Sequence, residues 1–598
     1  MDDLSLDLAS LRRAYESGLS AADVVRLVHR RIRSANDPGI FISLVAEEDA
    51  VARANALGAY DPSQPLWGVP FAIKDNIDLA GLPTTAACAE FAYTPQEDAV
   101  CVARLVSAGA IPIGKTNLDQ FATGLVGVRT PYPVPRNSFD PAMTPGGSSS
   151  GSAVAVARGL VSFALGTDTA GSGRVPAGLN NLVGLKPTLG AVSTRGVVPA
   201  CRTLDCVSVF ALTVDDAYAV FTEMTAYDEK DGYSREVRTP ALGAPPAAMR
   251  LAVPDEGSLD FGGDEVARAA FADVKRQAAA LGAQIIETNM QPFFEVAKLL
   301  YEGPWVAERY QAIRGIMESS PDALHPVTRS IIEGARRFSA ADAFGALYKL
   351  SDLKRAAESV WKGADALMTP TYPRPRTLAD LSIDPIGPNS ELGVYTNFVN
   401  LMDLCALAAP TALRSDGFPN SVTLIAPAGR DALIASFGAL LQHKCGGLLG
   451  ATGRKAPAPP ARSARAMPGE IEVAVVGAHL SGMALNGELT TRGARFLRAS
   501  PTKPDYRLFA LAGGPPRRPG LLRVPTGGVA ILTEVWAVPE ATFGSFVAGV
   551  PAPLGIGTTL LADGTQPKGF IVENIATVGA EDISAWGGWR AYCAGAAA

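Results

Sequence analysis

The sequence predicts an α/β fold with a mixed or mainly parallel central sheet covered by helices, followed by a smaller strand-rich α+β domain. Three observations lead to this prediction. Helical and strand patterns alternate over the first 450 residues, a Pro/Ala-rich segment follows, and short strand patterns separated by Gly/Pro turns fill the remainder. Alternation of helices and strands is typical of a sheet whose neighbouring strands are joined through helices.

Apolar residues mark the individual elements. They recur at helical spacing over residues 11–34, 47–57 and 99–108, which predicts helices there. GVPFAIK (68–74) and AIPIGK (110–115) are short apolar runs of the kind that form buried strands. In the last part of the chain, the runs that begin at Glu470, Tyr506 and Gly528 predict further strands.

The segment ATGRKAPAPPARSARAMPG has Pro, Ala and basic residues but no apolar periodicity. Such a composition is typical of a semi-rigid linker. We therefore expect a large domain over residues 1–450, a linker over 451–469 and a C-terminal domain over 470–598.

Composition excludes several classes of function. The 598 residues carry a net charge of −6 and show no basic stripe, so nucleic acid and anionic membranes are not expected partners. No run approaches the roughly 18–20 apolar residues that a membrane span needs, and the acidic start lacks the pattern of a signal peptide. The seven cysteines do not have metal-ligand spacing. We expect a soluble cytoplasmic protein with reduced thiols and neither metal nor cofactor.

Three segments carry residues suited to catalysis. Lys74 ends the apolar run GVPFAIK, where a lysine commonly reaches out to solvent. TPGGSSSGS (144–152) contains Ser148 and lacks the Lys-Ser or Lys-Thr of a phosphate-binding loop, so a flexible turn is the plain alternative. LGTDTAGSGRVPA, from Leu165, contains Ser172 in a tight turn. Its backbone N–H groups could converge as an oxyanion hole requires, although an ordinary strand-to-helix connection has the same pattern.

In their order and spacing, Lys74, GGSSSGS and GTDTAGSGRVPA resemble the amidase signature family, strongly over residues 66–212 and loosely over the first 450. The resemblance implies the amidase signature fold and a triad in which Ser172 is the nucleophile, Ser148 a bridging serine at a cis peptide bond and Lys74 the base. It further implies an oxyanion hole from the backbone N–H groups of Thr169, Ala170, Gly171 and Ser172, with Asp168 and Arg174 bracing the loop.

The chemistry of such a triad is consistent. A serine hydroxyl is a weak nucleophile until a base takes its proton. Lysine is a base only when neutral, which requires its ordinary pKa of about 10.4 to fall through burial or nearby positive charge. The chain contains only His29, His325, His443 and His479, none near these motifs, and has neither G-x-S-x-G nor H-E-x-x-H. A Ser-His-Asp hydrolase and a metallohydrolase are therefore not supported.

The substrate is suggested by LLYEGPWVAERYQAIRG, from Leu299, which resembles the substrate-recognition segment of the allophanate hydrolase branch of the family. Allophanate carries a carboxylate, to which Arg309 can donate two charge-assisted hydrogen bonds. The resemblance implies that Tyr301 and Arg309 bind substrate and that the Gly124 carbonyl contacts its amide. Without it, Arg309 would be taken as a solvated helix arginine.

By resemblance, the expected reaction is deamination of allophanate to N-carboxycarbamate and ammonia, by a homodimer coupled to a urea carboxylase in urea assimilation or s-triazine breakdown. A broad small-amide amidase and a non-catalytic assembly protein stay open as alternatives.

The last 130 or so residues resemble the C-terminal domain of allophanate hydrolases, which is similar to the gamma-glutamyl cyclotransferase fold. The acidic residue that those cyclotransferases use is not evident in ATFGSFVAGV. The resemblance implies a role in decarboxylating N-carboxycarbamate, with His479, Asn486 and Tyr506 as candidate residues. A module that mediates assembly is the alternative.

Overall fold

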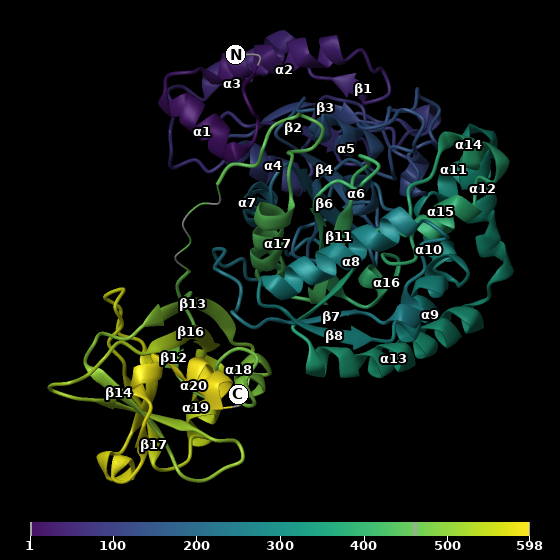
Figure 1. Ribbon diagram of the computed structural model, residues 1–598. Coiled ribbons are helices and arrows are strands. Elements are labelled where there is room, and N and C mark those ends of the chain that lie inside the picture. The colour runs from purple at the N-terminus through teal and green to yellow at the C-terminus, as the bar shows by residue number, and fades with distance from the viewer. Residues whose placement is uncertain (1–2, 459, 461, 463, 597–598) are drawn as a thin grey trace. The chain divides into compact units, whose positions relative to one another are not determined.

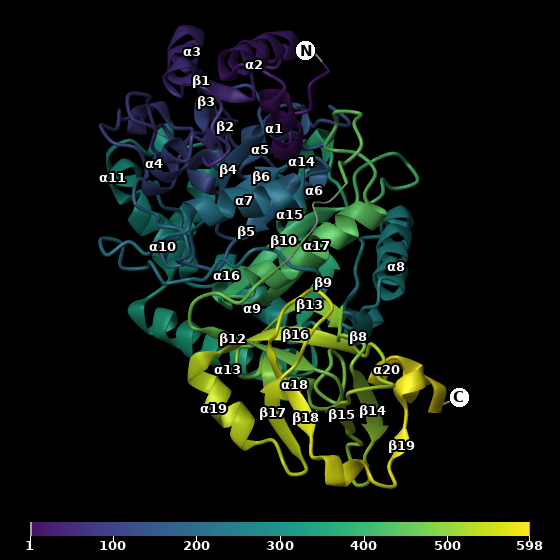
Figure 2. The same ribbon diagram turned by 90° about the vertical axis from the view of Figure 1, so that its left-hand side faces the viewer.

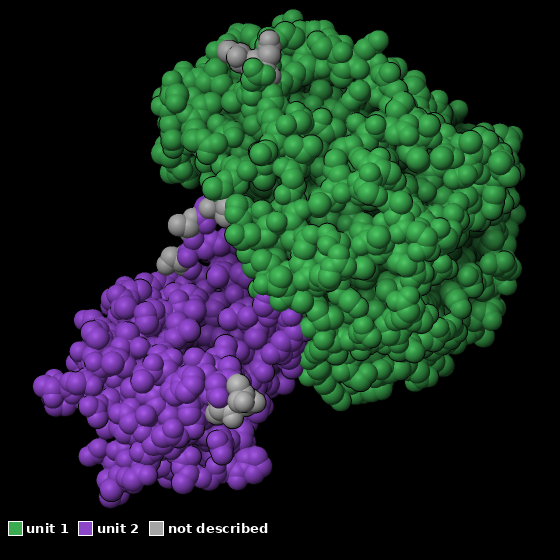
Figure 3. All heavy atoms as spheres, viewed as in Figure 1, with its two compact units in different colours: residues 1–239, 251–281, 285–459 green, residues 240–250, 282–284, 460–598 purple. Residues whose placement is uncertain are grey.

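The computed structural model describes residues 3–458, 460, 462 and 464–596, and within them the chain forms two compact units. The first comprises residues 1–239, 251–281 and 285–459, and the second residues 240–250, 282–284 and 460–598 (Figure 3). Part of the expected linker, residues 459, 461 and 463, lies outside the described residues. The domain limits given above stay a prediction.

The first unit contains an eleven-stranded mixed sheet, which confirms the predicted fold class (Figure 1). Its strand order is β1-β3-β2-β4-β6-β5-β10-β11-β9-β7-β8. The pairs β2–β3, β2–β4 and β7–β9 are parallel, while β4–β6, β5–β6, β5–β10 and β10–β11 are antiparallel. The strands are β1 (Phe41–Leu44), β2 (Pro70–Lys74), β3 (Ile111–Thr116), β4 (Phe163–Asp168), β5 (Val183–Lys186), β6 (Cys206–Ala211), β7 (Arg250–Pro254), β8 (Gln284–Thr288), β9 (Ala366–Pro370), β10 (Leu404–Pro410) and β11 (Ser421–Pro427).

Helices cover this sheet (Figures 1 and 2). Helix α5 packs on β2, β4 and β6, α7 on β5 and β6, and α17 on β10 and β11. All eight residues of α5 are buried, which suits a helix with no polar face in its sequence SGSAVAVA. The principal helices are α1 (Leu8–Glu16), α2 (Ala21–Ala35), α3 (Glu47–Ala56), α4 (Val100–Ser107), α5 (Ser150–Ala157), α6 (Val175–Leu179), α7 (Val214–Met224), α8 (Glu265–Ala280), α9 (Gln291–Tyr301), α10 (Trp305–Ala312), α11 (Arg314–Ser319), α12 (Pro326–Glu333), α13 (Ala340–Gly363), α14 (Leu378–Ile383), α15 (Gly387–Leu392), α16 (Phe398–Leu401) and α17 (Asp431–Cys445).

The helical spacing over residues 11–34 is divided between two helices, α1 and α2. Gly18 between them adopts a φ of +93°, which a helix cannot include. The Ser20 side chain then accepts a hydrogen bond from the Asp23 N–H and starts α2 as its N-cap. The apolar spacing continues across this break because both helices bury one face.

The second unit is strand-rich, as predicted. A five-stranded sheet has the order β13-β16-β12-β18-β17 and a three-stranded sheet the order β15-β14-β19. Trp536, Leu508 and Phe546 belong to the core between these elements. The strands are β12 (Glu470–Val475), β13 (Arg495–Pro501), β14 (Tyr506–Ala510), β15 (Pro519–Arg523), β16 (Leu532–Pro539), β17 (Leu554–Thr558), β18 (Lys568–Val572) and β19 (Glu581–Asp582), and the helices are α18 (Asn486–Thr490), α19 (Glu540–Ala548) and α20 (Trp589–Ala596).

Among the helices of the described part of the chain, we find none with the length and apolar character needed to cross a bilayer. All seven cysteines are free thiols, six of them buried, as expected from their scattered positions.

Candidate active site

Lys74 and Ser148 meet at the end of β2. Lys74 is the last residue of this strand and is fully buried, and its Nζ lies 2.7 Å from Ser148 Oγ. Ser148 follows a cis peptide bond from Gly147 and precedes α5. The lysine does not reach solvent, so the plain alternative for this strand end is wrong.

A second hydroxyl holds the Lys74 amine. Lys74 Nζ donates to Thr167 Oγ1 at 2.8 Å, and the Asn76 side-chain amide donates to the same oxygen at 3.4 Å. Strands β2 and β4 are parallel neighbours, paired up to Ile73 and Leu165, so Lys74 and Thr167 both lie just beyond the last paired residues. Thr167 was not among the residues predicted from the sequence, although it lies within the GTDTAGS motif.

Burial lowers the pKa of Lys74 from its usual 10.5 to about 7. The carboxylates of Asp119, Asp168 and Asp205 act in the opposite direction and limit the fall, while the positive charge of Arg309 adds to it. A substantial fraction of the amine is therefore neutral near pH 7 and has a lone pair available for the proton of Ser148.

This pKa predicts the pH dependence of the reaction. Lys74 is protonated and inactive as a base below about pH 7, so kcat/KM should rise with pH through an apparent pKa near 7 and level off above it. The measurement is a pH–rate profile on an uncharged amide, whose own ionisation does not interfere. An acid limb centred near pH 4 would instead indicate a carboxylate base and contradict the assignment.

Ser172 lies in the turn between β4 and α6. Its Oγ donates to the carbonyl oxygen of Gly124 at 3.5 Å, which brings two of the predicted site residues together. Within the described residues, the backbone N–H groups of 169–172 donate no hydrogen bond to another backbone group. The Thr169 hydroxyl donates to Asp205 at 2.6 Å. Free N–H groups at a tight turn are what a developing oxyanion needs.

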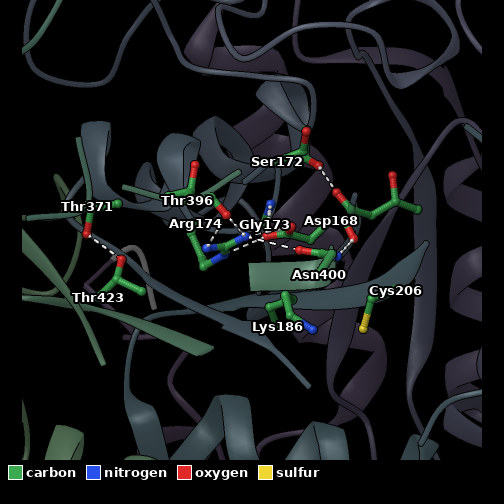
Figure 4. Close-up of polar contacts among 12 residues, drawn as sticks. Asp168, Ser172, Gly173, Arg174, Lys186, Cys206, Thr371, Thr396, Asn400 and Thr423 are labelled. Atoms are coloured by element: carbon green, nitrogen blue, oxygen red, sulfur yellow. Dashed lines mark hydrogen bonds and ion pairs between the residues drawn. The ribbon is translucent and has the colours of Figure 1, made fainter. Parts of the chain in front are cut away.

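The turn is braced by a buried ion pair (Figure 4). Arg174 donates to both carboxylate oxygens of Asp168 at 2.9 Å, and Asp168 also accepts from the Gly173 N–H at 3.0 Å. Arg174 continues to the Thr396 carbonyl, and Asn400 donates to the backbone carbonyl of Asp168 at 2.8 Å. A bidentate pair of this kind fixes the orientation of both side chains. Asn400 was not identified from the sequence, because nothing local relates it to Asp168.

Arg309 and Tyr301 lie together near the Gly124 turn. Only 2% of Arg309 is exposed, and its guanidinium lies 5.2 Å from the centre of the Tyr301 ring. Arg309 donates to the Tyr301 hydroxyl at 3.2 Å, to Thr123 Oγ1 at 3.2 Å and to the Ala122 carbonyl at 3.3 Å. The guanidinium is therefore buried beside the residues that precede Gly124, and Arg309 is not a solvated helix arginine.

The candidates of the second unit do not form one cluster. His479 Nε2 lies 3.0 Å from Glu488, and its ring stacks on Phe570. His479 and Glu488 line a cavity of about 40 Å³, to which Arg518 also contributes. Glu488 was missed because no acidic motif marks it.

The other two candidates have structural contacts. Asn486 donates to the His479 carbonyl at 3.0 Å and so supports that loop. Tyr506 is a core residue whose hydroxyl accepts from the Leu560 N–H at 2.9 Å. Neither belongs to the lining of the His479 cavity.

Comparison with known protein families identifies the larger part of the chain. The Amidase family model matches residues 23–434. The chain belongs to the amidase family. The model of the Allophanate hydrolase C-terminal domain matches residues 471–594 of this amidase.

Individual relatives agree with this assignment. Urea amidolyase of Saccharomyces cerevisiae is 42% identical over 97% of the chain, which corresponds to 32% of that protein. The chain spans about a third of the length of this relative. The structure of Kluyveromyces lactis allophanate hydrolase is similar with a TM-score of 0.79 and 41% identity, and the match covers 97% of this amidase and 98% of that chain. The urea amidolyase of Lachancea kluyveri is 41% identical over 94% of the chain and 31% of that protein.

Proposed function

We propose that the chain is an allophanate hydrolase that uses Lys74, Ser148 and Ser172 as its triad. The observation that carries this proposal is the buried guanidinium of Arg309, which lies against the turn leading to Gly124, the residue whose carbonyl contacts Ser172. A buried cation beside a serine nucleophile favours a substrate with a carboxylate close to the scissile amide. The similarity to the K. lactis allophanate hydrolase over almost the whole of both chains supports the same substrate.

In the proposed reaction, neutral Lys74 accepts the proton of Ser148, which in turn accepts that of Ser172. Ser172 Oγ attacks the terminal carboxamide carbonyl of allophanate, and the backbone N–H groups of residues 169–172 stabilise the resulting oxyanion. Ser148 returns the proton to the leaving nitrogen, and ammonia departs. Water then attacks the acyl-enzyme and releases N-carboxycarbamate, while Arg309 and Tyr301 hold the substrate carboxylate throughout.

The test is ammonia release from allophanate, malonamide and a long-chain fatty amide. We expect rapid turnover of allophanate, slow turnover of malonamide and none of the fatty amide. Cleavage of malonamide without cleavage of allophanate would favour the alternative of a broad small-amide amidase. It would also return Tyr301 and Arg309 to a structural role.

The proposed role of the second unit is the decarboxylation of N-carboxycarbamate at His479. Burial lowers the pKa of His479, and Glu488 opposes this shift, so the imidazole is largely neutral near pH 7. In the same assay, His479→Ala should leave the first ammonia unchanged and delay the second, which is released only after carbon dioxide is lost. An unchanged second phase would favour the alternative of an assembly module.

A cytoplasmic homodimer supplied with allophanate by a urea carboxylase also belongs to the proposal. The similarity to urea amidolyase over a third of that protein supports coupling of this kind. Urea assimilation and s-triazine breakdown stay equally open as the pathway.

A further inference from the structure

The turn that presents the Gly124 carbonyl has an unusual backbone. Phe121 and Ala122 both adopt left-handed conformations, with φ of 50° and 52°. Consecutive residues with a Cβ rarely do so, and the conformation persists only where the surroundings enforce it. Gly124 itself has no room for a side chain, because a Cβ there would overlap a carboxylate oxygen of Asp119. Something must hold this turn in place.

Arg129 makes four hydrogen bonds around the turn. Its guanidinium donates to the Thr123 carbonyl at 3.0 Å and to the Pro385 carbonyl at 2.9 Å. Its backbone N–H donates to Asp119 at 2.8 Å, and its carbonyl accepts from the Gln120 N–H at 2.7 Å. Only 2% of Arg129 is exposed. One buried residue therefore closes the turn through both its backbone and its side chain.

The same turn is tied to the bridging serine. The Asp119 N–H donates to the Ser148 carbonyl at 3.0 Å, and its carboxylate accepts from the Gly127 N–H at 2.9 Å. Arg129 is thus connected to the backbone of Ser148 through Asp119. It is connected to Gly124 through the preceding residue, Thr123. A displacement of the arginine would move both groups relative to Ser172.

Arg309 contacts the turn from a second direction, at Ala122 and Thr123. Both guanidinium groups are buried, and the hydrogen bonds named here for them go to carbonyl and hydroxyl oxygens. Their contacts differ, however. Arg309 also reaches the Tyr301 hydroxyl, whereas the two side-chain hydrogen bonds of Arg129 both end on backbone carbonyls.

We infer that Arg129 is a positioning residue for the amidase reaction, which holds the turn at 121–124 so that the Gly124 carbonyl stays beside the Ser172 hydroxyl. An amide attacked by Ser172 has its N–H within reach of that carbonyl, since the two oxygens are 3.5 Å apart. The inference rests on the proposed role of Ser172 as nucleophile. It does not depend on allophanate being the substrate.

The test compares Arg129→Ala with the wild type on allophanate and on malonamide. We expect kcat to fall about 10- to 100-fold on both substrates, with KM changed less than about threefold, because a misplaced group slows the chemical step for either amide. Low-millimolar guanidinium chloride should restore part of the activity by occupying the vacated space. The matched control is Arg414→Ala, which removes another buried arginine, paired with Asp264 and Asp416. It should leave kcat within about twofold and show no rescue.

Each other outcome is informative. A kcat within about twofold of wild type on both substrates would overturn the inference. A rise in KM for allophanate alone would also overturn it, since Arg129 would then bind the carboxylate. Should the wild type cleave only malonamide, the proposed substrate fails, while the Arg129 comparison is still made on malonamide.

Should Arg129→Ala not fold, the second variant is Arg129→Lys, which keeps the charge but not the two-donor fork. It should lose kcat in the same direction, and full activity in this variant would overturn the inference.

Discussion

Ser172→Ala is expected to lower kcat on every substrate of the enzyme by about 10⁴-fold or more, since the variant cannot form the acyl-enzyme. The Ser172 side chain contributes one hydrogen bond, at 3.5 Å, so its loss should change the melting temperature little. Ammonia release and thermal unfolding, measured on the same preparation, check both statements.

The matched control is Ser150→Ala. Ser150 is also buried and lies in the neighbouring Gly/Ser segment, where its Oγ donates to the Asn117 carbonyl. This variant should keep kcat within a few-fold of the wild type. Retention of activity in Ser172→Ala would assign the nucleophile elsewhere and would favour a non-catalytic role for the GTDTAGS turn.

Arg309→Ala is expected to lower kcat/KM for allophanate by about 10²- to 10³-fold. Loss of one partner from a buried charge pair costs about 2–5 kcal/mol, which corresponds to about 30- to 4,000-fold, and the loss expected here lies within that range. Malonamide has no carboxylate, so its kcat/KM should fall much less. The measurement is the ratio of the two losses, with Arg314→Ala as control, because Arg314 is exposed and pairs with Glu318.

Tyr301→Phe separates the two contacts between Tyr301 and Arg309. It removes the hydroxyl that accepts from Arg309 but keeps the ring beneath the guanidinium. A smaller loss, of about 10-fold, is expected for allophanate. Equal losses on allophanate and malonamide in Arg309→Ala would contradict carboxylate binding and would show that Arg309 only supports the turn at 122–123.

The fold class and the residues of the proposed triad could be predicted from the sequence because each depends on a short, continuous segment of the chain. Buried strands such as β2 are short apolar runs, and the three motifs around Lys74, Ser148 and Ser172 have a recognisable order. The break between α1 and α2 was missed, since Gly18 interrupts the backbone without interrupting the apolar spacing.

Long-range partners could not be predicted. Asn400 contacts Asp168 across 232 positions of the chain, and Arg129 and Arg309, which contact the same turn, are 180 positions apart. Tyr506 illustrates the opposite error, because a polar group at a strand end was taken as a pocket residue although it packs in the core. Pattern identifies which residues are unusual, but only the tertiary fold determines their neighbours.

The strand order also bears on when the enzyme becomes active during its synthesis. Strands β10 and β11 lie between β5 and β9, and Asn400 precedes β10, so the middle of the sheet and the brace on Asp168 come from late in the large unit. Lys74, Ser148 and Ser172 are all translated long before these elements. A nascent chain therefore carries every reactive group of the proposed triad for more than two hundred residues without the framework that aligns them. We therefore expect amide hydrolysis to begin only after β10 and β11 have joined the sheet and Asn400 has reached Asp168.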